Sequence, residues 1–144
     1  MHVADIIRTN PATPCNRRSG EFEQAVSPPD PLHGGLVKHL TAAELYWFHW
    51  AFEGVDFEHP DFGMDLSEGD SADSLLAAYG SAIERSNEII ERCSDLSHPC
   101  ARAAGKAGAV RSMRWVLVHM IEETARHAGH ADILREQTDG SIGR

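Results

Sequence analysis

The feature that most constrains the fold is a run at residues 114–136, RWVLVHMIEETARHAGHADILRE. Its apolar residues recur every three or four positions, which predicts a long amphipathic helix. Four polar residues, His119, Glu123, His127 and His130, fall within roughly 80° of arc when each residue turns the helix by about 100°. They therefore form one stripe along the helix, and a stripe of histidine and carboxylate side chains can hold a metal ion.

The apolar residues of the same helix show which part of the stripe points inward. With His119 set to zero, the apolar face is centred near about 120°, Glu123 lies at about 40° and His127 at about 80°. His130 and His119 lie at the edge of that face. Burying an ionised carboxylate costs several kcal/mol unless it is paired or binds a cation. We therefore predict Glu123 and His127 as an inward pair that needs a partner.

A second helical pattern supplies a third candidate ligand. In residues 35–52, GLVKHLTAAELYWFHWAF, the apolar face begins beside His39. Two helices packed at about 8–10 Å could bring His39 to Glu123 and His127. Two histidines and a carboxylate with a vacant position match a catalytic Zn²⁺ site, and the same set can hold Ni²⁺, Fe²⁺ or Mn²⁺.

Composition narrows the class of protein. The chain has 144 residues, enough for one domain but not two. It has no apolar run long enough to cross a membrane, and its first residues show no signal peptide pattern, so we expect a soluble cytoplasmic protein. A formal net charge of −9 without a basic cluster argues against binding to nucleic acid or to an anionic membrane.

The chain divides into an irregular N-terminal segment, residues 1–31, broken by prolines, and a helical domain, residues 32–144. We expect helices over residues 32–52, 70–93 and 112–138, the second capped by Asp70 or Ser71 and the third stopped by Gly140. An acidic loop at 53–70 and a second loop containing Pro99, Gly105 and Gly108 join them. No segment shows convincing strand alternation, so the predicted fold class is all-α.

The remaining polar residues carry weaker signals. The three cysteines, Cys15, Cys93 and Cys100, match no metal or redox spacing and are interpreted as reduced thiols. Arg126 falls away from the stripe and is expected at the surface. Four further histidines are expected to be solvated: His33, His49, His59 and His98.

Two segments together resemble the DinB superfamily: residues 114–140, with the core HMIEETARHAGHADILREQTDG, and GLVKHLTAAELYWF at 35–48. More narrowly, they are similar to a branch related to the metal-binding domain of mycothiol-dependent maleylpyruvate isomerase. The resemblance implies a DinB-like four-helix bundle of up-down-down-up topology, often dimeric, with a divalent metal held at the positions of His39, Glu123 and His127. This chain departs from the family before residue 31, where the first helix is expected to be degenerate or missing.

These observations favour a divalent-metal-dependent enzyme that uses a low-molecular-weight thiol such as mycothiol on an electrophilic small molecule, as a transferase or isomerase. The metal, Zn²⁺ by preference, would bind the thiol in its open position, and His130 or His119 could move a proton. One alternative is a non-catalytic, stress-related metal-binding protein acting as a dimer. A second is a metal-assisted hydrolase. A homodimer is expected in the leading hypothesis as well.

Overall fold

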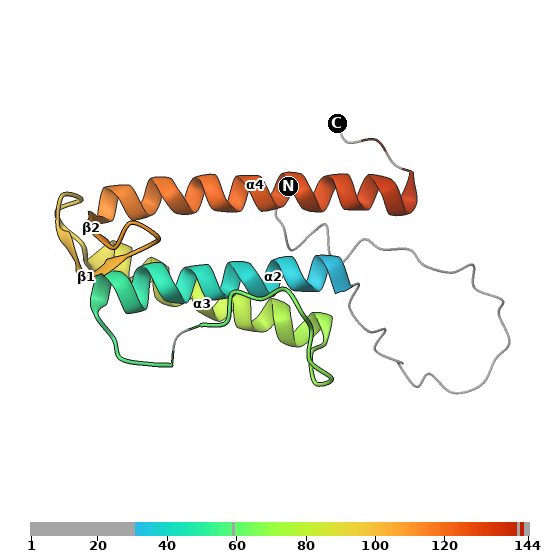
Figure 1. Cartoon of the computed structure of the whole chain (residues 1–144), viewed down its shortest axis with the longest axis horizontal. Coiled ribbons are helices and arrows are strands. Elements are labelled where there is room, and N and C mark those ends of the chain that lie inside the picture. The colour runs from blue at the N-terminus through green and yellow to red at the C-terminus, as the bar shows by residue number, and fades with distance from the viewer. Residues whose placement is uncertain (1–30, 59, 141, 143–144) are drawn as a thin grey trace, which may run out of the picture.

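The computed structural model describes residues 31–58, 60–140 and 142 (Figure 1). The irregular segment predicted at residues 1–31 lies outside these residues, except for Pro31. The prediction that the first bundle helix is degenerate or missing also falls outside them. In chain order the elements are α2 (Pro31–Glu44), η1 (Leu45–Glu53), α3 (Ala72–Arg92), β1 (Pro99–Ala104), β2 (Ala109–Ser112) and α4 (Met113–Asp139). The chain is mostly helical, as predicted.

Helix α2 continues directly into η1, a segment of wider π-helical turns, so the two together cover the predicted helix at 32–52. The sequence of η1 is rich in aromatic residues, and Trp47, Phe48 and Ala51 are buried. Gly54 ends the segment with φ of 77°, a value that a residue with a side chain rarely adopts, and its N–H donates to the carbonyl of His49. A Cβ at Gly54 would also lie 2.9 Å from the Cβ of Ala101 in β1.

The start of α3 and the end of α4 are set by residues that the sequence predicted as caps. Ser71 is the N-cap of α3 and accepts from the backbone N–H of Ser74. Ser112 plays the same part for α4, accepting from the N–H of Trp115 at 3.4 Å. Gly140 terminates α4 with φ of 71°, as predicted.

The loop predicted between α3 and α4 contains a small antiparallel hairpin, so the prediction that the chain has no strands is wrong at this point. Strand β1 pairs with β2 from Pro99 opposite Ser112 to Ala104 opposite Ala109, with an irregularity before Ala103. Both strands are short, and β1 is rich in alanine, so neither carries a usable alternation of apolar and polar residues. Arg102 fixes the hairpin by donating to two backbone carbonyls at the end of η1, Trp50 and Val55, each at 2.9 Å.

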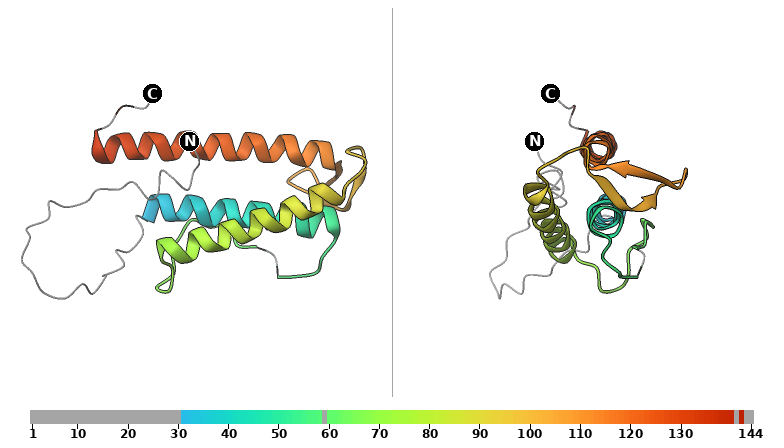
Figure 2. Two further views of the ribbon diagram at one scale, coloured as in Figure 1. Left: turned by 180° about the vertical axis from the view of Figure 1, so that it is seen from behind. Right: turned by 90° about the vertical axis from the view of Figure 1, so that its left-hand side faces the viewer.

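The three long helical segments lie side by side, α2 and α3 running in one direction and α4 in the other (Figures 1 and 2). This is the direction that the last three helices of an up-down-down-up bundle take, and the described residues hold no fourth. The largest core cluster lies beside the hairpin and includes Trp47, Phe48, Met113 and Val116. Among the described residues, no helix is both long and apolar enough to span a membrane.

The connection from η1 to α3 returns along α2, which places its backbone close to that helix (Figure 2). A Cβ at Gly35 would lie only 2.4 Å from the carbonyl oxygen of Met64, so glycine is required for this approach. Lys38 Nζ donates to the carbonyl of Asp65 at 2.8 Å and holds the same stretch. The loop thereby reaches the level of His39.

Candidate metal centre

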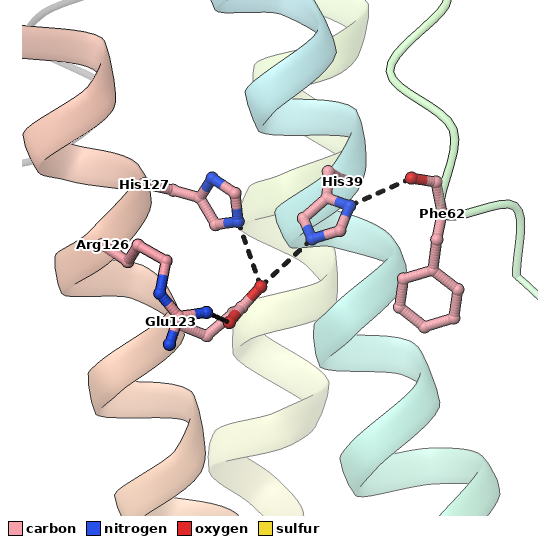
Figure 3. A network of polar contacts seen from close by, with 5 residues as sticks. All are labelled: His39, Phe62, Glu123, Arg126 and His127. Carbon is pink, nitrogen blue, oxygen red and sulfur yellow. Dashed lines mark hydrogen bonds and ion pairs between the residues drawn. The ribbon is translucent and has the colours of Figure 1, made fainter. Parts of the chain in front are cut away.

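His39 of α2 and Glu123 and His127 of α4 converge at one point (Figure 3). Oε1 of Glu123 lies 3.2 Å from Nε2 of His39 and 3.0 Å from Nε2 of His127. One potential ligand atom from each residue lies within 4.8 Å of the other two. The helical wheel selected this inward pair on α4, and helix packing supplies the third group from α2.

The three side chains are mostly withdrawn from solvent, with exposed fractions of 17% for His39, 13% for Glu123 and 8% for His127. Burial opposes ionisation of Glu123, but hydrogen bonds with His39 and His127 and the charge of Arg126 outweigh it and lower the pKa of the carboxyl group. Burial also lowers the pKa of His127 and is only partly offset by Glu123. For Glu123 and His127, an ionised carboxylate beside a neutral imidazole is the protonation state in which these groups bind metals.

A backbone carbonyl decides which nitrogen of His39 is available. Nδ1 of His39 lies 3.0 Å from the carbonyl oxygen of Phe62, which can only accept, so Nδ1 carries the proton. In a neutral ring, Nε2 then directs a lone pair at the Glu123 carboxylate. These two atoms repel each other unless a proton or a cation lies between them.

The residues therefore fit a divalent cation. They offer two imidazole nitrogens and one carboxylate oxygen, a set found in catalytic zinc sites. Second hydrogen bonds from metal-binding histidines to carbonyl groups fix the ring orientation, and the contact from His39 to Phe62 is of that kind. Nδ1 of His127 is buried and has no hydrogen-bond partner among the described residues.

Arg126 belongs to this site, although the sequence placed it on the surface, away from the stripe. Its side chain is 56% exposed, yet its guanidinium donates to Oε2 of Glu123 at 2.7 Å, which leaves Oε1 directed at the histidines (Figure 3). The spacing of three residues between an acid and a base is a signal for such a pair, and it could have found the contact.

The two histidines predicted to move protons lie in different surroundings. His130 is exposed, and its ring centre lies 5.6 Å from that of His127. His119 is not among the three converging residues. Its ring stacks on Trp115 at 4.8 Å and meets the edge of Trp47 at 4.7 Å, and burial lowers its pKa.

Aromatic residues extend the wall beside the triad. The ring of Phe62 packs edge-on against His39, 5.8 Å between ring centres, and against Tyr46. Tyr46 in turn stacks on Trp50, and its hydroxyl oxygen accepts a hydrogen bond from the N–H of Gly105. These contacts join the loop, η1 and the hairpin around one end of the site.

The structure is thus that of a mostly helical protein with a candidate metal centre between α2 and α4. The chain matches the family described as mycothiol-S-transferase over residues 21–140. Because this match covers most of the chain, the protein belongs to the mycothiol S-transferase family. No curated protein and no solved structure matches it significantly.

Proposed function

We propose that this protein is a divalent-metal-dependent transferase that joins a low-molecular-weight thiol of the mycothiol type to an electrophilic small molecule. The observation that carries the proposal is the convergence of ligand atoms from His39, Glu123 and His127 within 4.8 Å. The family match supports thiol transfer and does not favour the two alternatives, a non-catalytic metal-binding protein and a hydrolase.

In this proposal His39, Glu123 and His127 hold the metal, Zn²⁺ by preference, with Ni²⁺, Fe²⁺ and Mn²⁺ as the alternatives. When bound, a metal with an open position lowers the pKa of a coordinating thiol and presents it as a thiolate. The protein's part is to keep the ligands oriented: the carbonyl of Phe62 holds the His39 ring, and Arg126 holds the second oxygen of Glu123.

The thiol proton must leave as the carbon–sulfur bond forms. We place its acceptor at His130, which is exposed and adjoins His127. His119 is the second candidate, since its lowered pKa keeps the ring neutral and able to accept a proton at neutral pH. In a substitution reaction the thiolate sulfur attacks the electrophilic carbon and the leaving group departs with the bonding electrons.

We further propose that the chain lies in the branch related to mycothiol-dependent maleylpyruvate isomerase and acts as a homodimer. Support comes from the His–Glu–His ligand set, which matches that branch by resemblance. The bundle would then be a DinB-like four-helix bundle in which α2, α3 and α4 are kept and the first helix is degenerate or missing.

The test is metal reconstitution. Chelator-treated protein should regain thiol-transfer activity when Zn²⁺ is added. In the assay, the sulfur of mycothiol displaces chloride from chlorodinitrobenzene, and the absorbance of the thioether product gives the rate. The double variant Glu123→Gln, His127→Ala should stay at background, because two of three ligands are lost, whereas His98→Ala, an exposed histidine outside the triad, should respond like the wild type. Full activity in the double variant would exclude the triad as the reactive centre.

A further inference from the structure

A second candidate binding site lies on the opposite side of the α2–α4 contact from the metal triad. It is a groove of about 450 Å³ between α3 and α4, and its wall is mainly apolar. Representative wall residues are Phe48, Ile83, Met120 and Ile121. Ile121 is 69% exposed, so this wall presents apolar surface to solvent.

The floor of the groove is polar and buried. Glu44 is 9% exposed and Ser86 is 2% exposed, and both line the groove. Oγ of Ser86 has no partner of good hydrogen-bond geometry among the described residues. No lysine or arginine is among the residues that line this groove. A buried carboxylate and hydroxyl thus face an apolar groove without a cation to balance the charge.

The surroundings of Glu44 disfavour its ionised form. Burial raises the pKa of Glu44, and the nearby Ser86 hydroxyl only partly opposes the change. Burial, together with the charge of Glu44, raises the pKa of Tyr79 to about 12. A group that brings positive charge and hydrogen-bond donors to Glu44 would favour its ionised form against the effect of burial.

We propose that this groove binds a small amphiphilic amine, a molecule with one ammonium group and an alkyl or aryl body. The ammonium group would donate to the Glu44 carboxylate and to Oγ of Ser86, while the apolar body would cover Ile121 and its neighbours. The volume falls within the range of about 300–1,000 Å³ typical of small-molecule sites. The net charge of −9 on the chain also favours approach of a cation.

The site is separate from the metal centre. On α4 the groove residues Thr124 and Ala128 are each turned by about 100° from Glu123 and His127, their neighbours in sequence. Amine binding therefore does not rest on the proposed thiol transfer, and it should be the same with and without Zn²⁺.

The test is calorimetric titration of the full chain with octylammonium. We expect one site, with butylammonium binding at least about tenfold more weakly because less apolar surface is buried. Octanol, which keeps the chain length but lacks the charge, should also bind at least about tenfold more weakly. Glu44→Gln should weaken octylammonium binding at least about tenfold, and Glu84→Gln, an exposed change on the same helix as Ser86, should leave it unchanged.

Ser86→Ala provides a second variant in case Glu44→Gln does not fold. It should weaken binding of octylammonium several-fold. Equal binding of octanol and octylammonium, or full binding to a folded Glu44→Gln protein, would overturn the proposal. No binding to a protein that sediments as a dimer would assign the groove to a second copy. No binding to a monomer would assign it to another part of the same chain, and either result rejects the amine.

Discussion

Glu44 and Glu123 are both carboxylates on inward-facing helix positions, yet their surroundings move their pKa values in opposite directions. Two histidines and an arginine outweigh burial at Glu123 and lower its pKa, whereas Glu44 has only a serine hydroxyl against burial and its pKa rises. The difference decides what each can do. The surroundings of Glu123 favour the ionised form that binds a cation, whereas ionising Glu44 costs the fold free energy.

We predict that this cost appears in the pH dependence of stability. Because the folded state raises the pKa of Glu44 above its usual value of 4.5, its protonated form stabilises the fold below that pH, and the stabilisation is lost as pH rises through the folded pKa. The free energy of unfolding of Glu44→Gln should therefore rise relative to that of the wild type as pH increases, and the difference should reach about 1 kcal/mol at pH 7. Urea titrations at pH 4.5 and pH 7 measure it, with Glu84→Gln as the control. A gain of equal size at both pH values would contradict the prediction.

Single residues were predictable where helix periodicity alone places them. The inward positions of Glu123 and His127 follow from their angles on one helix. The contact of Arg126 with Glu123 depends on the side-chain conformation of the arginine, which a helical wheel does not give. His33 was expected in solvent, and that is wrong: it is 9% exposed, with Nε2 3.4 Å from the carbonyl of Ala131. Its burial comes from α4, a partner about 100 residues away in sequence, which local patterns do not reveal.

At the scale of elements, the helices could be predicted because each has a helical spacing of apolar residues and because α3 and α4 also have capping residues, while the hairpin has neither signal. The path of the loop between η1 and α3 could not be predicted from the sequence either. Its course depends on Gly35, where a side chain would collide with the backbone of Met64, and this close approach brings the carbonyl of Phe62 to His39.

Gly35→Ala should therefore damage the metal centre from a distance. The added methyl group must displace the loop, so we expect a loss of about 1–3 kcal/mol in stability and a fall of about tenfold in Zn²⁺ affinity. The matched control is Gly80→Ala in α3, where a Cβ meets nothing within 4 Å. That change should stabilise the protein by up to about 1 kcal/mol and leave metal affinity intact.

Chemical unfolding measures the stability of each variant, and competition with a chromophoric chelator measures its Zn²⁺ affinity. Unchanged Zn²⁺ affinity in Gly35→Ala would show that the loop does not position His39.

For the whole molecule, the candidate metal centre is a bridge between α2 and α4, which lie 84 residues apart in sequence at His39 and Glu123. The family resemblance anticipated this bridge and the directions of the three helices. The treatment of residues 32–144 as one domain remains a prediction, as does the dimer, because a single chain contains no partner surface to read.

A bridge of this kind should couple metal binding to global stability. Zn²⁺ at a hundred times its dissociation constant should add about 2.7 kcal/mol to the free energy of unfolding, seen as a rise in Tm that a chelator reverses. His39→Ala should remove most of the rise, because it deletes the only ligand from α2. A rise of the same size in His39→Ala would place the metal elsewhere.

The contact between His39 and Phe62 involves the main chain of residue 62 rather than its side chain. A substitution at position 62 therefore changes the ring that packs on His39 but keeps the carbonyl that accepts from its Nδ1. In the proposed enzyme, side-chain changes at this position would alter the wall beside the triad, whereas an insertion or deletion in the loop would also move the carbonyl.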